Sequence, residues 1–143
     1  MTTRVDFYVL PSADPDARLG FACRLAAKAW REGMRVYLLC ADAAQRDSLD
    51  ARLWSFRGEA FIPHSDMEED SAAPVALGLG APPEGQRDLL INLTLAIPEF
   101  APRFARIAEL VVEEPSIRQA ARENFRTYRQ QGYPLDTHPL PRP

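Results

Sequence analysis

The chain has 143 residues, of which 46% are hydrophobic and 26% are charged, as expected for one globular domain that buries its own core. Seventeen basic and twenty acidic residues give a formal net charge of -3, so the molecule as a whole is not an electrostatic clamp for nucleic acid. We therefore expect any role on DNA to pass through a protein partner.

The N-terminus and the cysteines indicate the cellular compartment. The first residues, MTTRVDFYVL, lack the basic start and long apolar core of a signal peptide, and no apolar run approaches the length of a membrane span. Cys23 and Cys40 lie in apolar segments without CxxC spacing, where a free thiol behaves as a small hydrophobic group. These features predict a soluble protein of the reducing cytoplasm.

The first forty residues predict a strand, a helix and a second strand. Apolar runs over residues 5–10 and 35–40 are typical of buried parallel strands, and between them Asp14 and Pro15 start a helix that Gly33 ends. Together they predict a βαβ unit. The loop after the first strand, PSADPDARLG, contains neither GxGxxG nor GxxxxGK[ST], which argues against a dinucleotide or phosphate-loop site.

An aromatic segment follows the next helix. Asp42 and Gln45 predict the N-terminus of that helix, which leads to Trp54. Trp54 and Phe61 are either core residues, the usual fate of aromatic side chains, or exposed anchors of a protein interface. The residues alone favour the core.

An acidic loop follows the aromatic segment and contains possible metal ligands. His64 is a candidate base or ligand, but the other histidine, His138, lies far along the chain. The acidic residues of the loop lack the ligand spacing and glycine of a calcium loop; they are Asp66, Glu68, Glu69 and Asp70. We expect a solvated loop, with no metal and no cofactor.

The second half of the chain predicts four further elements and a tail. In order they are an edge strand over residues 75–77, a buried strand over 89–93, a short helix over 97–106 and a last strand over 110–112. With the final helix, the order predicts an α/β fold, a three-layer α/β/α sandwich with a mostly parallel central sheet, Rossmann-like but without a phosphate-binding loop. We expect a single domain over residues 1–133 and a proline-rich C-terminal tail over 134–143, outside the core.

The final helix is predicted over residues 116–132, SIRQAARENFRTYRQQG. Pro115 and Ser116 start the helix, Gln119 completes a capping box with Ser116, and Gly132 ends the helix. Its apolar side comprises Ile117, Ala120, Ala121, Phe125 and Tyr128. Beside this apolar side runs a stripe of four arginines, namely Arg118, Arg122, Arg126 and Arg129.

The arginine stripe allows two interpretations. Four guanidinium groups along one helix repel one another unless an anion faces them. A cationic row beside an aromatic ring suits a ligand that carries carboxylate and apolar groups. Alternatively, the stripe is a solvated helix face whose arginines pair with acids elsewhere in the fold.

Several fragments of the chain resemble one protein family. They are FYVL at residues 7–10, AxxLAxxAWxxGxRVxLxC over 22–40, LW at 53–54, FIPH at 61–64, LLINL at 89–93 and ARENFRTYRQQGY over 121–133. Each fragment is weak alone, but their order and spacing are specific. On these motifs the chain resembles, over nearly its whole length, the chi subunit of bacterial DNA polymerase III, an accessory component of the clamp loader.

This resemblance implies a non-enzymatic adaptor in DNA replication that contacts DNA only indirectly and no membrane. Members of that family bind the acidic C-terminal tail of single-stranded DNA-binding protein, which ends in a phenylalanine with its free carboxylate. They also bind the psi subunit of the clamp loader and, in some bacteria, an iron–sulfur helicase. The tail-binding positions of the family correspond to Arg118, Arg122, Phe125 and Arg126. Trp54 and Phe61 match its aromatic patch for psi or the helicase, which favours partly exposed anchors at these two positions.

Two other functions compete with the adaptor. A small α/β enzyme acting on a nucleotide or phosphorylated substrate would use residues near strand ends, where Ser12, Asp14 and Asp42 are the best candidates. Direct binding of single-stranded DNA through the arginine stripe and Phe125 would combine charge with stacking. The negative net charge disfavours this last function.

Overall fold

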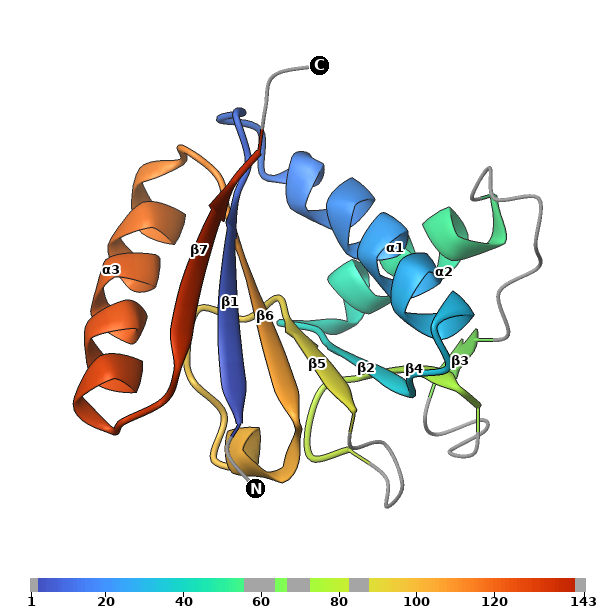
Figure 1. The fold of residues 1–143 in the computed structure, drawn as a ribbon. Coiled ribbons are helices and arrows are strands. Elements are labelled where there is room, and N and C mark those ends of the chain that lie inside the picture. Colours follow the sequence, from blue (N-terminus) through green and yellow to red (C-terminus); the bar gives the residue numbers. More distant parts are fainter. Residues whose placement is uncertain (1–2, 56–63, 67–72, 83–87, 141–143) are drawn as a thin grey trace.

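The computed structural model describes residues 3–55, 64–66, 73–82 and 88–140, which form a parallel sheet flanked by helices (Figure 1). The elements follow one another as β1 (Arg4–Val9), α1 (Asp16–Arg31), β2 (Val36–Leu39), α2 (Ala43–Trp54), β3 (His64–Asp66), β4 (Val75–Gly78), β5 (Leu89–Asn92), the short 3-10 helix η1 (Ala101–Arg103), β6 (Arg106–Val111), α3 (Pro115–Gln130) and β7 (Leu135–Pro139).

The strands of the described residues form one seven-stranded sheet in the order β3-β4-β2-β5-β6-β1-β7. Every neighbouring pair in it is parallel. The predicted βαβ unit places β1 and β2 in the same parallel sheet, but β5 and β6 lie between them. As a result, β1 pairs with β6 on one side and with β7 on the other.

The sheet separates the core into two layers. Helices α1 and α2 cover one face of the sheet, and α3 covers the other (Figure 1). The layer under α1 and α2 includes Ala22, Ala26, Leu38, Leu49 and Ile91. The layer under α3 includes Phe7, Tyr37, Leu90, Ile107 and Tyr128. Strands covered on both faces carry continuous apolar runs, and all four residues of β2 are buried. The predicted three-layer α/β fold is therefore confirmed.

Both cysteines lie in the core. Cys23 and Cys40 are buried and free of disulfide bonds. Burial raises the pKa of the Cys23 thiol to about 11, so the thiol stays protonated and apolar at neutral pH. Within the described ranges, the helices lack the length and apolar character needed to cross a membrane.

The predicted helix ends hold for α2 and differ at the start of α3. The carboxylate of Asp42 accepts the N–H of Gln45 at 2.8 Å, as the sequence predicts. For α3, the helix begins at Pro115, one of the two residues predicted to start it, but the predicted Ser116 cap is wrong. Glu114 is the capping residue, and its Oε2 accepts the N–H of Ile117 at 3.0 Å. Gly132 follows α3 with a positive φ of 84°, which suits a glycine stop.

Three predictions for the second half of the chain are wrong in detail. Residues 75–77 are predicted as an edge strand, but β4 lies inside the sheet because β3 pairs with its outer side. Residues 97–106 are predicted as a helix and contain only the three-residue η1. Pro102 within this run lacks the N–H that an α-helix requires. The strand predicted at 110–112 begins earlier, since β6 spans Arg106–Val111.

The structure also differs from the prediction in the C-terminal tail. Leu135–Pro139 form β7, which pairs in parallel with β1 and makes one edge of the sheet. Pro134 precedes this strand and Pro139 is its last residue. Most of the side chains of the strand are exposed. A proline at a strand end is compatible with an edge strand, where fewer ladder hydrogen bonds are needed.

Candidate functional site

A pocket of about 450 Å³ lies between α3 and the strands β1, β6 and β7. The sequence-predicted residues Arg118, Arg122, Phe125 and Arg126 all line it. The helix also supplies Ala121 and Arg129, and the strands supply Phe7, Val9, Val111 and Thr137. We call this site the arginine pocket.

The arginines come together because they recur on successive turns of α3. Residues three and four positions apart lie on the same side of a helix, so Arg118, Arg122, Arg126 and Arg129 form one row. All four side chains are exposed. The row follows the rim of the pocket, where each guanidinium group can reach a ligand and still contact water.

The apolar wall of the pocket is held in place by aromatic packing. Phe125 is half-buried, and its ring meets the edge of Phe7 with 5.3 Å between centroids and an interplanar angle of 62°. Phe7 is 3% exposed and also packs against Tyr128, at 6.1 Å. These contacts fix the ring of Phe125 beside the arginines, so the pocket offers a rigid apolar surface next to positive charge.

No acidic side chain within residues 3–55, 64–66, 73–82 and 88–140 forms a salt bridge with these four arginines. Glu123, on the same helix, instead accepts a hydrogen bond from Gln119 at 2.9 Å. The interpretation of the stripe as a face that is neutralised inside the fold is therefore wrong for the described part of the chain. The rim of the pocket carries positive charge that an anionic ligand would neutralise.

A buried polar network fixes α3 to the sheet beneath the pocket. The Tyr128 hydroxyl donates to Oε2 of Glu109 at 2.7 Å, and Nδ2 of Asn92 donates to the same oxygen at 3.0 Å. Burial raises the pKa of Glu109 to about 7, against the lowering effect of these hydrogen bonds and of the Arg18 charge. Arg18 is itself buried and donates from Nε to the carbonyl of Leu110 at 3.0 Å.

Sequence reasoning missed this network, although a signal for it was present. Asn92 and Glu109 are isolated polar residues within the apolar strands β5 and β6. A polar residue in a strand that is buried on both faces needs a partner, which predicts a contact between such positions.

The second predicted surface lies at the end of α2. Trp54 is 59% exposed, so the core interpretation is wrong for this residue, and its role as an interface anchor stays a prediction. Its ring contacts the ring of His64, with centroids 4.7 Å apart. His64 is buried, and its Nε2 lies 3.3 Å from Oδ1 of Asp50 on α2. Phe61, the other predicted residue of this surface, lies outside the described residues.

The residues considered for an enzyme function occupy turns and helix caps. Ser12 Oγ accepts the N–H of Asp14, and the Asp14 carboxylate accepts the N–H of Asp16, each at 3.0 Å. Asp42 caps α2 as described above. These side chains therefore stabilise local backbone, each within its own loop.

The candidate metal ligands are not brought together in the described part of the chain. His64 lies on β3 and His138 on β7, which are the two opposite edges of the sheet. Asp66 ends β3, whereas Glu68, Glu69 and Asp70 lie outside the described residues. Among the described residues, no three acidic, histidine or cysteine side chains are grouped as a metal site requires.

Comparisons with known proteins agree with the motifs. The family model of the DNA polymerase III chi subunit, HolC, matches residues 1–136. The DNA polymerase III subunit chi of Pseudomonas aeruginosa is 75% identical over 140 residues, covering 98% of this chain and 99% of the relative. The subunit chi of Haemophilus influenzae is 34% identical over 140 residues, which cover 96% of this chain and 97% of the relative.

The Escherichia coli subunit chi is 35% identical over 118 residues, covering 80% of each chain. The residues that the family model matches include strands β1 to β6 and helix α3, which carries the arginine row. The chain therefore belongs to the family of the DNA polymerase III chi subunit.

Proposed function

We propose that the protein is a non-catalytic adaptor of the DNA polymerase III holoenzyme. It binds the C-terminal tail of single-stranded DNA-binding protein in the arginine pocket and links it to the clamp loader through the psi subunit. The observation that supports this function is a row of exposed arginines, unpaired within the described residues, beside the fixed ring of Phe125. Such a site suits a peptide terminus that carries an aromatic ring, a free carboxylate and further acidic side chains.

Binding divides the peptide terminus between the two parts of the pocket. The terminal ring enters the apolar part beside Phe125, Phe7 and Val111. The terminal carboxylate accepts hydrogen bonds from Arg122 and Arg126, because a guanidinium group presents a planar pair of donors that matches a carboxylate. Arg118 and Arg129, at the two ends of the row, attract the acidic side chains that precede the terminus.

The expected energies fit a moderate affinity. A hydrogen bond to a charged group contributes about 1.5 to 3 kcal/mol. A micromolar complex has a binding free energy of about -8 kcal/mol, so two or three such bonds and one buried ring account for a large part of it. Loss of one arginine should therefore weaken binding about tenfold or more.

The exposed Trp54 supports a second contact, with the psi subunit or with an iron–sulfur helicase. Exposed tryptophans are frequent anchors of protein interfaces. Trp54 ends α2 beside β3, at one edge of the sheet, whereas β7 and α3 lie at the other edge (Figure 1). This separation lets one molecule hold two partners at the same time, as an adaptor must.

Peptide binding tests the proposal. A labelled peptide that copies the tail of single-stranded DNA-binding protein is titrated with the wild type, with Arg122→Ala and with Arg31→Ala as a matched control. Arg31 is an exposed arginine at the end of α1, outside the pocket. We expect micromolar binding that is lost in Arg122→Ala, retained in Arg31→Ala and lost when the last phenylalanine of the peptide is removed.

Two results would contradict the proposal. The first is failure of the tail to bind wild type at low salt. The second is equal weakening by Arg31→Ala and Arg122→Ala, which would indicate non-specific attraction. A competition experiment separates tail binding from DNA binding, because an oligonucleotide that displaces the peptide at equal or better affinity would favour direct binding of single-stranded DNA.

A further inference from the structure

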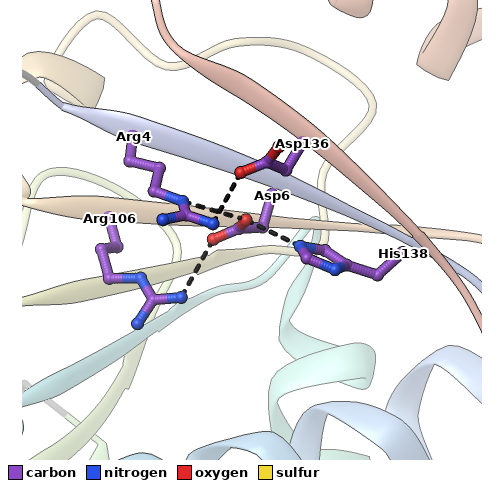
Figure 2. Close-up of polar contacts among 5 residues, drawn as sticks. All are labelled: Arg4, Asp6, Arg106, Asp136 and His138. Atoms are coloured by element: carbon purple, nitrogen blue, oxygen red, sulfur yellow. Dashed lines mark hydrogen bonds and ion pairs between the residues drawn. The ribbon is translucent and has the colours of Figure 1, made fainter.

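A buried carboxylate joins three strands on the sheet face opposite the arginine pocket (Figure 2). Asp6, on β1, is 2% exposed, and its Oδ1 lies 2.8 Å from Nε2 of His138 on β7. Its Oδ2 accepts a hydrogen bond from Arg106 on β6 at 3.1 Å. Arg4 completes the group, with Nε donating to Oδ1 of Asp6 at 3.3 Å and Nη2 donating to Asp136 at 2.6 Å. We call these five residues the Asp6 cluster.

The Asp6 carboxylate is charged in the folded protein. Burial by itself would raise the pKa of Asp6, but the hydrogen bonds from His138 and Arg106 and the charge of Arg4 outweigh it and lower the pKa. A buried charge that loses a partner is costly, so the cluster holds its members together.

Strand β7 lies at the edge of the sheet, so among the described strands it pairs with β1 alone, over five register positions from Val5↔Leu135 to Val9↔Pro139. Pro139 within it has no N–H to donate to the ladder. The side chains of Asp136 and Thr137 are exposed, whereas Leu135 is partly buried and packs against the core layer under α3. His138 adds a stacked contact with Tyr8 on β1, with ring centroids 5.0 Å apart. His138 therefore supplies side-chain contacts that add to the backbone ladder with β1 in fixing this strand.

The same strand forms part of the wall of the arginine pocket. Successive residues of a strand point to opposite faces of the sheet. In β7, Thr137 lines the pocket, whereas its neighbours Asp136 and His138 belong to the Asp6 cluster on the other face. The register pairs Thr137 with Phe7 and His138 with Tyr8. A shift of β7 would therefore move a wall of the pocket away from Phe7.

We propose that Asp6 and His138 are positioning residues for the arginine pocket, which act through β7 without touching the ligand. The effect on peptide affinity rests on the proposed function, whereas the effect on the pocket wall is independent of it. The family model ends at residue 136, so His138 lies beyond the part of the chain that it describes.

The test measures β7 and the pocket in the absence of any ligand. Amide hydrogen exchange of residues 133–140 and the methyl NMR signals of Val9 and Val111 are compared in wild type, His138→Ala and His138→Gln. In His138→Ala we expect exchange in β7 to be faster by about tenfold and both methyl signals to shift, while exchange in β2 and β5 is unchanged. Glutamine can still donate to Asp6, so His138→Gln should restore most of the wild-type behaviour.

Asp136→Asn is the matched control on the same strand. Its partner Arg4 is half-exposed, and an exposed ion pair contributes little. We expect a much smaller effect than in His138→Ala, and an equal effect would overturn the specific role of His138. Unchanged exchange of β7 in His138→Ala would also overturn the proposal.

Titration with the tail peptide then tests the consequence for binding. We expect His138→Ala to bind the peptide about three- to tenfold more weakly and His138→Gln to bind nearly as wild type. If β7 exchange rises but affinity stays the same, while Arg122→Ala still weakens binding, the link from His138 to the pocket is overturned. If wild type does not bind the peptide, the proposed function fails, and the ligand-free exchange and methyl shifts still decide whether His138 positions the wall.

Discussion

The hydroxyl of Tyr128 donates a hydrogen bond of 2.7 Å to the Glu109 carboxylate in the interior of the protein. Tyr128 belongs to α3, which carries the arginine row, and Glu109 belongs to β6, a central strand. Both residues are buried, so water cannot replace either partner. This bond fixes the rotation of α3 about its axis and thereby the direction in which the arginines point.

Replacing Tyr128 with phenylalanine should destabilise the protein by about 1 to 3 kcal/mol, because Glu109 loses one of its two donors in a buried site. Denaturant unfolding measures this change in the free energy of unfolding. Tyr133→Phe is the matched control, since Tyr133 is half-buried, its ring packs against that of Tyr128 with centroids 5.3 Å apart, and its backbone N–H donates to the Tyr128 carbonyl at 3.1 Å, a bond that the substitution leaves in place. A loss of stability in the control equal to that in Tyr128→Phe would contradict the role of the hydrogen bond.

Stability should fall as the pH rises through neutrality, because Glu109 has a pKa of about 7 in the folded protein and an ordinary value of 4.5. Between these two values the folded state binds more protons than the unfolded state, so the contribution is full below about pH 4.5 and is lost as pH rises through 7. Its size is at most about 3 kcal/mol. Unfolding curves from pH 5 to 9 measure it, and Glu109→Gln should flatten the profile. An equally steep profile in Glu109→Gln would assign the effect to another group.

Peptide binding in the arginine pocket should weaken with salt, because ions in solution screen the charges of the four exposed arginines of the rim. Raising the salt from about 0.05 M to about 0.3 M should reduce the affinity several-fold. Arg122→Lys keeps the charge but loses the paired donors, so we expect it to retain the salt dependence at a lower affinity. Isothermal titration at several salt concentrations measures both effects. Wild-type affinity in Arg122→Lys would show that charge alone is sufficient.

Substitutions at the two proposed surfaces should each abolish the binding of a different partner. Trp54 is 59% exposed, so Trp54→Ala should change the free energy of unfolding by less than about 1 kcal/mol. We expect this variant to bind the tail peptide as wild type does and to lose binding to the psi subunit or the helicase. Arg122→Ala should show the opposite behaviour. Pull-down with each purified partner measures the pattern, and loss of both partners in either variant would contradict two independent surfaces.

Helical periodicity made the arginine pocket predictable from the sequence. The spacing of Arg118, Arg122, Phe125 and Arg126 fixes their side of α3 whatever the rest of the fold does, and all four line one pocket. The strand contribution was not predictable in the same way. Phe7 and Thr137 are distant in the chain, and only the pairing of β1 with β7 brings them together.

The missed strands share a physical cause. A strand with buried side chains on both faces, such as β2, can be recognised in the sequence as an apolar run. By contrast, β7 is a half-exposed edge strand with the sequence LDTHP, so neither its pattern nor its proline indicates a strand. The edge position predicted for residues 75–77 failed for a related reason, because the polar strand β3, HSD, lies outside it.

The position of β1 between β6 and β7 has a consequence for the order of events during synthesis. Thr3 bonds to a carbonyl 101 positions away, and Arg4 pairs with Asp136 across 132 positions. The first strand made by the ribosome can therefore pair with β6 only after residue 106 has been made, and with β7 only after residue 135. Contacts of such high sequence separation slow folding. A chain that stops before residue 135 would leave one side of β1 unpaired, and the arginine pocket would lack the wall that Thr137 supplies until β7 has emerged.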